Sequence, residues 1–511
     1  MAELPSHIDG YGDVRPFAGA FANLEAVRRT ASRIRSVPPG QRKVLPDLAA
    51  AIDASGLRNG GTISFHHHLR NGDGVLNAVM EAIASRGLRD LRVAASALFP
   101  VHAPLVQHIE AGIVSRICAS TIYGPVAHSV MAARLAAPAL MYTHGGRARC
   151  LESGELHIDV AFVGAPTADT YGNVSGVNGR AACGPLGYAI ADVQCADCVI
   201  AVTDNLVPYP AFPSDITQDY VDFVVPVPSI GDPTQIVSGT TRPTSDPDAL
   251  RIASLATRVI ESSGLLVDGF SFQAGAGGAS LAASAYLKQI MMTRRVQGSF
   301  ASGGITGSIV EMLDAGLFRA LFDVQCLDLA AVDSYRRNEA HQAMSASMYA
   351  NPHNRGCVAN QLDAVILGAA EIDCDFNVNV TTAADGSILG GSGGHADIAA
   401  GAKLAIITTR LTAGKFPKIV ERVGTVTTPG ETVDALVTEE GVAVNPRRSD
   451  LADRLRAGGI GVRPIGELLE RSVQIAGESG STSLSRPDGP VVAVVEYRDG
   501  TVIDVVRSRT A

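Results

Sequence analysis

Two stretches of this chain that lie far apart in the sequence repeat one another. Residues 158–174 align with residues 362–378 and share Asp, Gly, Ala, Asp, Asn and Val in register. Two shorter matches follow in the same order at nearly the same spacing: His108–Gly112 with Met312–Gly316, and Ile63–Phe65 with Phe270–Phe272. Such a series of matches indicates an internal duplication, and its period is far too long for a solenoid. The sequence therefore predicts two copies of one domain.

Each copy alternates short apolar runs with helical patterns. Runs of this kind are typical of strands buried on both faces of a sheet, and their alternation with helices favours mostly parallel sheets with helices outside. The predicted strands are residues 93–97, 159–163, 199–203, 364–367, 404–409 and 491–495. The clearest predicted helices are residues 74–86 and 278–292. The expected fold is two tandem open α/β domains.

The length of the chain, 511 residues, is also more than one ordinary core can organise. We expect an N-terminal arm over residues 1–45, helical around Phe21–Arg35, then a first α/β domain over 46–235 and a second over 236–511. The proline-rich segment 206–244 is expected to contain the junction. The tail beyond Thr412 is expected to finish the sheet of the second domain.

Composition excludes several classes of partner. The formal net charge is -9 and the chain has no block of Lys and Arg, which argues against binding to nucleic acid or to an anionic membrane. The chain has no basic and apolar leader and no apolar run of the roughly 18 residues that span a bilayer, so we expect a cytoplasmic protein. Cys195 and Cys198 form a CxxC without a second pair, and we expect no metal site.

The segment Gly390–Ala402 combines closely spaced glycines with a following helical pattern. Glycine lets main-chain N–H groups approach a phosphate or an oxyanion, and the start of a helix adds positive potential. We expect Gly391, Gly393 and Gly394 to form such a cradle, with His395 as a further donor. An ordinary glycine-rich turn is the alternative.

Two further segments are candidates for binding. Gly275, Gly277 and Gly278 follow a predicted strand and open a predicted helix, so they either hold phosphate groups or allow tight strand–helix packing. His66, His67, His68 and Arg70 follow another predicted strand. For the histidine run three interpretations are open: carboxylate binding, packing or turn structure, and metal ligation. If the strand continues, His66 and His68 share one face.

Taken together, Gly60–Asp73, Phe272–Gly278, the 362–378 repeat and Gly390–Ala402 resemble the citrate lyase α-subunit family, the citrate CoA-transferases, over nearly the whole chain. These proteins are related to the family I CoA-transferases, which have two tandem open α/β domains with the site between them. The resemblance implies that the glycines at 391, 393 and 394 form an oxyanion hole. It also implies that the glycines at 275, 277 and 278 hold the pantetheine arm or its phosphates.

One position departs from the family I pattern. Many of those enzymes have a nucleophilic Glu on a strand end ahead of a helix that ends in Glu-Ala-Gly. Aligned on Asp314–Gly316, this chain has Gly303 at the Glu position, and the nearest alternative is Glu311 within a predicted helix. The resemblance therefore implies that no enzyme thioester forms and that a citrate carboxylate attacks the acetyl thioester directly.

The resemblance also implies partners and co-substrates. They are a lyase β subunit, a γ acyl carrier protein bearing a phosphoribosyl-dephospho-CoA arm, citrate and acetate, in a large oligomeric complex; no permanently bound cofactor is expected, and a CoA thioester is the co-substrate. Three rivals stay open: a CoA-transferase for citramalate or another small acid, a sugar-phosphate isomerase, which needs a carboxylate base, and a non-enzymic ligand sensor.

Overall fold

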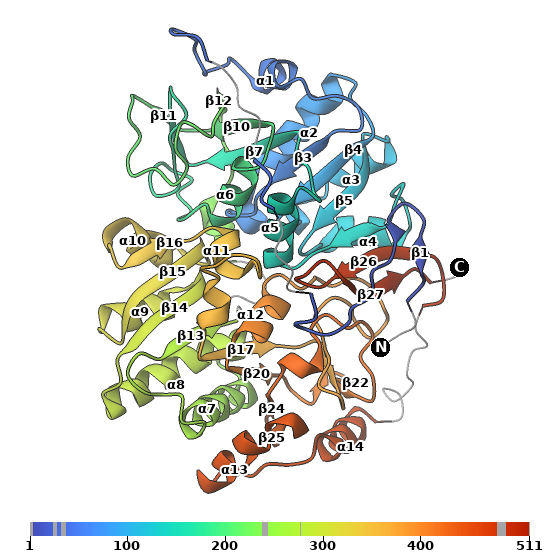
Figure 1. Ribbon diagram of the computed structural model, residues 1–511, viewed down its shortest axis with the longest axis vertical. Helices are drawn as coiled ribbons and strands as arrows, with labels where there is room; N and C mark the ends of the chain where they lie inside the picture. Colours follow the sequence, from blue (N-terminus) through green and yellow to red (C-terminus); the bar gives the residue numbers. More distant parts are fainter. Residues whose placement is uncertain are drawn as a thin grey trace.

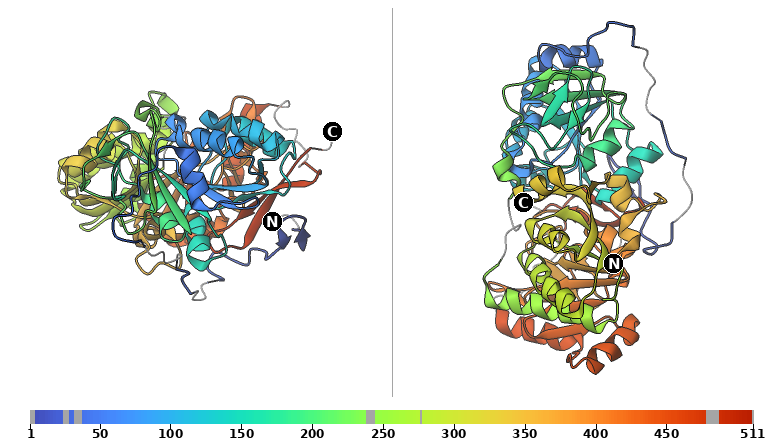
Figure 2. Two further views of the ribbon diagram at one scale, coloured as in Figure 1. Left: turned by 90° about the horizontal axis from the view of Figure 1, so that it is seen from above. Right: turned by 90° about the vertical axis from the view of Figure 1, so that its left-hand side faces the viewer.

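Two α/β halves are stacked along the long axis of the molecule (Figure 1). The computed structural model describes residues 4–23, 28–31, 37–237, 244–275, 277–477 and 487–509. The upper half in Figure 1 is coloured blue to green and the lower half yellow to orange, so each half comes mainly from one continuous part of the chain. The side view in Figure 2 separates the same two halves.

The first half is built on a sheet of nine strands. Its strands are parallel except for the last pair, β26 and β27. The order across the sheet is β12 (Phe223–Pro226), β10 (Cys198–Thr203), β7 (Val160–Ala165), β3 (Thr62–Phe65), β4 (Leu91–Ala95), β5 (Val114–Ala119), β6 (Ala139–Met141), β26 (Val491–Glu496) and β27 (Val502–Arg507).

The second half is built on a sheet of eight strands, again parallel except for its last pair. The order is β16 (His341–Ala343), β15 (Phe318–Cys326), β14 (Gly298–Ile305), β13 (Ser271–Ala274), β17 (Ala364–Gly368), β20 (Leu404–Thr408), β24 (Ala435–Thr438) and β25 (Gly441–Val444).

The predicted duplication is confirmed by the topology of the two sheets. Seven strands follow one another in the same order in both, from β6 to β12 in the first and from β16 to β24 in the second. Each half also carries a small three-stranded sheet, which lies beside the end of β7 in the first half and beside the end of β17 in the second. These are β11 (Leu206–Val207), β8 (Thr167–Asp169) and β9 (Val174–Ser175), and β19 (Val378–Asn379), β18 (Glu371–Asp373) and β23 (Ile419–Val420).

Helices cover the sheets. They are α1 (Leu48–Ser55), α2 (Val75–Ser85), α3 (Leu105–Glu110), α4 (Gly124–Met131), α5 (His144–Ser153), α6 (Gly187–Val193), α7 (Pro247–Ser262), α8 (Gly278–Arg294), α9 (Gly307–Asp314), α10 (Leu329–Arg337), α11 (Ala346–Ala350), α12 (His395–Gly401), α13 (Ser449–Ala457) and α14 (Ile465–Ala476). Local sequence fixes several starts: Asp47 caps α1, Thr143 caps α5, and Asp246 caps α7 with proline at the first helical position. Helix α11 of the second half packs on α5 and α6 of the first.

The C-terminal part of the chain corrects one expectation. The tail finishes the second sheet only as far as β25, because β26 pairs with β6 and so extends the first sheet. Figure 1 shows these red strands returning to the upper half. A continuous apolar run predicts a buried strand, but its sequence does not say which sheet edge the strand joins. The proposed boundaries at 46–235 and 236–511 stay a prediction, and β26 and β27 cross them.

The N-terminal arm lies along the molecule (Figure 2). It contains the hairpin β1 (His7–Ile8) and β2 (Gly12–Asp13), whose Ile8 packs against Val494 and Val502. The helix expected around Phe21–Arg35 is absent from residues 21–23 and 28–31, while 24–27 and 32–35 lie outside the described residues. A last pair of short strands, β21 (Thr412–Ala413) and β22 (Phe416–Pro417), lies in the second half.

Among the helices of the described residues, none combines the length and the apolar composition required to cross a bilayer.

Candidate active site between the two domains

A cavity of about 610 Å³ lies between the two halves. Residues that line it follow the carboxyl ends of strands in both sheets: His67 after β3, His144 after β6, Gln273 at the end of β13 and Gly368 at the end of β17. Ligands of open α/β sheets bind at these ends, where the connecting loops leave the strands. The duplicated fold therefore points the ligand-binding ends of both sheets into one cavity.

His67 and His144 present their Nε2 atoms as a neutral donor and acceptor pair. The Ser96 hydroxyl accepts the His67 main-chain N–H at 3.1 Å and lies 2.5 Å from Nδ1. Its hydrogen has no other acceptor among the described residues, so it donates to Nδ1, and Nε2 of His67 carries the ring proton. The Ser120 hydroxyl donates to the Ser96 carbonyl at 2.9 Å and therefore accepts from Nδ1 of His144, also at 2.9 Å.

Burial keeps both rings neutral. Desolvation lowers the pKa of His67 well below its ordinary value and that of His144 to about 3, and neighbouring positive groups act in the same direction. The two rings are stacked with centroids 5.7 Å apart, and Tyr188 packs against both. The cavity wall thus offers an N–H donor from His67 and a lone pair from His144. The sequence analysis missed His144, whose only local signal is its place after a strand and before two glycines.

Of the predicted histidine run, His67 and Arg70 line the cavity, whereas His66 and His68 do not. Carboxylate binding therefore stays a prediction for His67, whereas His66 and His68 have no place in the cavity lining. Strand β3 ends at Phe65, so the alternation that would put His66 and His68 on one face stops there. Nε2 of His66 lies 3.1 Å from buried Asp192, and burial lowers the pKa of His68 to about 3.

Arg70 lies at the first-domain end of the cavity. Its guanidinium donates to the Ile236 carbonyl at 3.2 Å and lies 5.5 Å from the centre of the Phe99 ring. Burial lowers the pKa of Arg70. Arginine stays charged at neutral pH even when buried, so this side chain puts a fixed positive charge beside His67.

The predicted glycine turn lies against the first domain and lines the cavity at residues 391–395. A Cβ at Gly391 would lie 2.2 Å from the Ser120 carbonyl oxygen, so no other residue fits there. The main chain of Gly393 bonds the His144 N–H at 2.8 Å, and its own N–H meets the Ser120 carbonyl at a long 3.5 Å. The N–H groups of Gly391 and Gly394 have no acceptor within the described parts of the chain. The turn therefore has main-chain donors available to a ligand.

His395 does not have the role that was expected for it. Its Nε2 donates to the Gly368 carbonyl at 2.8 Å, and its Nδ1 accepts from the Thr428 hydroxyl at 2.7 Å. Burial lowers its pKa to about 4, so the ring is neutral with both nitrogens in use. His395 therefore fixes α12 to β17 and has no proton left for an oxyanion.

The second glycine loop opens helix α8 onto the cavity. Gly275 uses its N–H in a bond to the Ile366 carbonyl at 2.7 Å, so it is not a ligand donor. Gly277 and Gly278 lie at the start of this long helix, where the first N–H groups have no partner inside the helix. The buried hydroxyl of Ser280 also lines the cavity and has no hydrogen-bond partner among the described residues. The loop is thus polar at its ligand end, as anion binding requires.

The electrostatic character of the cavity is cationic. Among the described residues that line it there is no Asp and no Glu. Lys418, which the sequence analysis did not single out, lines the second-domain side, and burial lowers its pKa to about 8 in spite of the nearby carboxylates Glu439 and Glu371. With Arg70 at the other side, the cavity suits an acidic ligand.

Gly303 is on β14, next to the cavity-lining Gly304, and its backbone has a φ of +104°. A Cβ at this position would lie 2.6 Å from the side-chain amide of Gln273. That amide is held on both sides, because it donates to the Tyr349 hydroxyl at 2.8 Å and accepts from the Ser302 hydroxyl at 3.1 Å. The expected nucleophile position thus contains a glycine packed under a fixed glutamine.

The fold and the cavity define a two-domain enzyme of the CoA-transferase type. Residues 41–509 match the family model "Citrate lyase, alpha subunit". The chain is 46% identical over 467 residues to the citrate lyase alpha chain of Klebsiella pneumoniae, covering 91% of each, and 44% identical over 506 residues to that of Haemophilus influenzae, covering 99% of each. The chain belongs to the citrate lyase alpha-subunit family, and it is a transferase component of that multi-subunit enzyme.

A solved structure agrees with this membership. This structure, from Streptococcus mutans, is of a protein assigned as the alpha subunit of citrate lyase, in complex with citrate. Its sequence is 42% identical to that of this chain. The TM-score is 0.92, and the alignment covers 96% of each chain. The duplicated α/β architecture is therefore that of the family.

Proposed function

We propose that this chain transfers an acyl carrier thioester from acetate to citrate: acetyl thioester and citrate give citryl thioester and acetate. The thioester is borne by an acyl carrier protein with a CoA-like arm. The observation that carries the proposal is the cationic interdomain cavity, with main-chain donors at Gly391 and Gly394 and no carboxylate in its described lining. The citrate complex of the Streptococcus mutans relative supports the choice of acid.

The absence of a lining carboxylate bears on the mechanism. A covalent route needs an enzyme carboxylate that attacks the thioester, and the expected position holds Gly303 beneath Gln273. We infer a ternary complex instead. A citrate carboxylate adds to the acetyl carbonyl and expels the carrier thiolate, which leaves a citryl–acetyl anhydride. The thiolate then adds to the citryl carbonyl and expels acetate, so atoms and charge balance.

Polar groups of the cavity have roles in these two addition steps. Citrate is a trianion near neutral pH, and Arg70, Lys418 and the Nε2–H of His67 supply positive charge and a donor for its carboxylates. The lone pair of His144 is available to accept the citrate hydroxyl. Both additions create an oxyanion, which the N–H groups of Gly391 and Gly394 are placed to stabilise. Loss of one such donor costs about 3 kcal/mol in other enzymes.

The remaining donors suit the thioester arm. The start of α8 at Gly277 and Gly278, with the buried hydroxyl of Ser280, would hold its phosphate or pantetheine groups. The arm belongs to a γ acyl carrier protein, and the citryl thioester passes to a β subunit that splits it. The isomerase alternative is disfavoured, since that chemistry needs a carboxylate base in the cavity.

The test is acyl exchange with the purified protein. Acetyl-CoA or acetylated carrier protein is mixed with citrate, and citryl thioester and acetate are followed by mass spectrometry, with citramalate as the competing acid. In parallel the protein is treated with acetyl donor alone and then with borohydride or hydroxylamine. Citryl thioester without any modified enzyme carboxylate is the expected result. A trapped enzyme thioester contradicts the ternary complex, and exchange with citramalate but not citrate contradicts the choice of acid.

A further inference from the structure

A second polar pocket lies outside the interdomain cavity. It has a volume of about 240 Å³ and lies on one face of the first sheet, between the end of α5 and the turn that joins β1 and β2. Its lining includes residues that belong to four adjacent strands, β4, β5, β6 and β26, or that directly follow one of these strands. Its polar and charged lining consists of Tyr11, Arg92, Arg116, Cys118, Tyr142, Cys150, Glu155 and Glu496.

Two arginines face each other in this pocket. Arg92 on β4 and Arg116 on β5 are register partners, and both point to the face that carries Cys118, because side chains alternate along a strand. Like charges directly opposite on neighbouring strands repel each other unless an anion lies between them. The Arg116 guanidinium donates to the Asp90 main-chain carbonyl at 3.4 Å and lies 3.7 Å from the Asp90 carboxylate, whereas the Arg92 guanidinium has neither a hydrogen bond nor an ion pair with any described residue.

The acidic residues of the pocket do not supply that anion. Glu155 accepts two hydrogen bonds from Arg149, at 2.5 and 2.8 Å. Glu496 accepts from the Tyr11 hydroxyl at 2.9 Å, and burial raises its pKa to about 7, so its charge is incomplete at neutral pH. The pocket therefore has an excess of positive charge, because the Arg92 guanidinium is unpaired among the described residues and Arg116 is paired only with the exposed Asp90.

We propose that this pocket binds a small free dianion, of the phosphate or short dicarboxylate class, between the guanidinium groups of Arg92 and Arg116. Guanidinium groups bind such oxyanions through paired, charge-assisted hydrogen bonds. Tyr11 and Tyr142 line the same space, and the Tyr11 hydroxyl is already occupied by its bond to Glu496. This proposal does not depend on the reaction proposed for the interdomain cavity.

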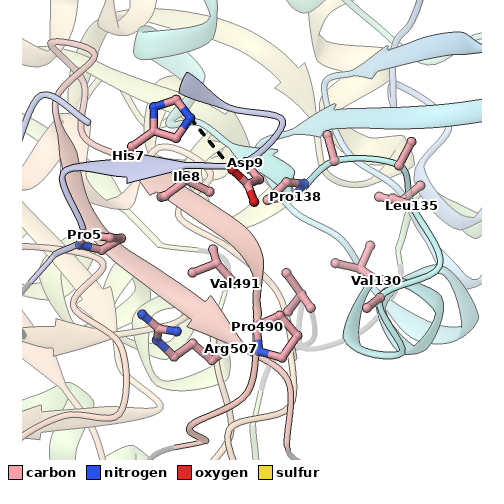
Figure 3. A pocket seen from close by; sticks show the side chains of 14 residues that line it. Pro5, His7, Ile8, Asp9, Val130, Leu135, Pro138, Pro490, Val491 and Arg507 are labelled. Carbon is pink, nitrogen blue, oxygen red and sulfur yellow. Dashed lines mark ion pairs between the residues drawn. The ribbon is translucent and has the colours of Figure 1, made fainter. Parts of the chain in front are cut away.

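A neighbouring groove has no such excess of unpaired positive charge. The groove, of about 420 Å³, shares Ala137 and Pro138 with the pocket, and its walls include the apolar side chains of Ile8, Val130, Leu135 and Val491 (Figure 3). Its cationic groups are engaged. Arg507 donates to the Gly489 carbonyl at 3.1 Å, and His7 lies 2.8 Å from Asp13 and 3.9 Å from Asp9.

The pocket is also connected to the active site through two strands. Tyr142 lines the pocket, and His144, two residues further on, lines the interdomain cavity. On β26, Glu496 lines the pocket, and Arg498 two residues later lies 3.8 Å from Asp397 of α12. A dianion here would thus lie beside both segments that position the catalytic turn.

The first test is thermal unfolding in inorganic phosphate, compared with chloride at equal ionic strength. At about ten times its Kd, phosphate is expected to raise Tm by about 1–2 °C in a protein of this size. Arg92→Gln and Arg116→Gln should each weaken the apparent affinity at least about 10-fold, the value of one lost charge-assisted bond. Arg92→Lys should retain part of it. Without phosphate, Arg92→Gln should unfold no earlier than wild type, because one repulsive charge is gone.

Lys418→Gln is the matched control, because it removes a cation from the other cavity. Phosphate should still stabilise this variant. A phosphate effect lost in Lys418→Gln and kept in Arg92→Gln, or no effect on the wild type, would overturn the proposal.

A second measurement keeps the proposal testable if the arginine variants do not fold. Wild-type crystals soaked in tungstate, a heavy analogue of phosphate, are expected to give an anomalous peak between the guanidinium groups of Arg92 and Arg116. Soaked crystals without a peak at that place would reject the site.

Discussion

The carboxylate of Asp397, at the start of α12 in the second domain, accepts a hydrogen bond from the Thr143 hydroxyl of the first domain at 2.8 Å. Its other oxygen accepts the N–H of Gly145 at 2.9 Å. The same Thr143 hydroxyl accepts from Gly146 and so caps α5. One buried carboxylate thus joins the helix that follows the glycine turn to the helix that begins with His144, and so links the two sides of the cavity.

The first prediction concerns the pH dependence of this contact. Burial raises the pKa of Asp397 to about 6, although Arg498 and the Gly145 N–H act in the opposite direction. The folded protein therefore binds this proton more tightly than the unfolded chain, whose carboxyl has its ordinary pKa of 3.8. The contribution to stability is full below about pH 4 and falls, by about 3 kcal/mol, as the pH rises to about 6.

Asp397→Asn should remove this slope. Its Tm should change less between about pH 4 and pH 6 than that of the wild type, although one donor loses its acceptor and the variant is less stable throughout. Thermal unfolding of both proteins across this range measures the difference. The control is Asp314→Asn, an exposed carboxyl without a described partner, which should follow the wild type. Parallel curves for Asp397→Asn and wild type would show that this carboxyl does not titrate as argued.

The fold followed from the sequence to a large extent, because one repeat carried most of the information. The repeated segments indicate which strands correspond in the two halves. Two copies of one domain then predict two sheets with a similar order of strands. What the pattern could not specify is long-range pairing. Residues 491–496 have the apolar signature of a buried strand, but only the edge left open at β6 decides where they pair.

The candidate site was predictable where backbone chemistry decided it. The glycines at 391, 393 and 394 predict that main-chain N–H groups come close to a ligand, and these residues line the cavity. The roles of side chains were harder to predict, because the role of a histidine ring depends on the hydrogen bonds of its two nitrogens. The donor role expected for His395 fails for this reason. Lys418, between the short strands β22 and β23, has no distinctive signal in the sequence, and only its position in space identifies it.

The second prediction concerns Lys418. Because burial lowers its pKa to about 8, the KM for the acid substrate should rise as the pH passes about 8 and the charge is lost. Lys418→Gln should raise KM about 10-fold at neutral pH, the value of one charge-assisted hydrogen bond, with a smaller change in kcat, and should flatten the profile. Lys418→Arg should keep KM low at high pH. Steady-state kinetics as a function of pH measure these effects.

Lys415→Gln is the control for that series. Lys415 is exposed and lies over Phe416, outside the cavity lining, so its loss should leave KM unchanged. An equal rise of KM in both variants would indicate a general electrostatic effect of net charge and not a contact with the acid.

The third prediction concerns the nearest available nucleophile. Glu311 is the Glu closest in sequence to Gly303, but it lies within α9, is 68% exposed and pairs with Lys288 at 2.9 Å. Glu311→Gln should therefore leave kcat within about twofold, since exposed ion pairs contribute little. A catalytic nucleophile would show a loss of several orders of magnitude instead. Single-turnover acyl exchange separates these outcomes, and a large loss would reinstate a covalent route.

The fourth prediction tests the packing at Gly303. Gly303→Ala places a methyl group 2.6 Å from the Gln273 amide and forces an L-residue to a φ of +104°, so either the amide shifts or the strand does. The expected cost is about 1–3 kcal/mol in stability, with reduced exchange activity because Gln273 holds Tyr349 at the cavity wall.

Gly466→Ala provides the matched comparison. This glycine is in α14 of the same half, with open space around a new Cβ and no positive φ, so the substitution should be neutral or slightly stabilising. Thermal unfolding and exchange rates of the two variants decide the matter. If Gly303→Ala were as stable and active as Gly466→Ala, the glutamine would be mobile, and the space above Gly303 would then be open to a carboxylate. Gly303→Glu would become the informative variant, because a trapped thioester on it would show that only the missing side chain separates this chain from the covalent enzymes.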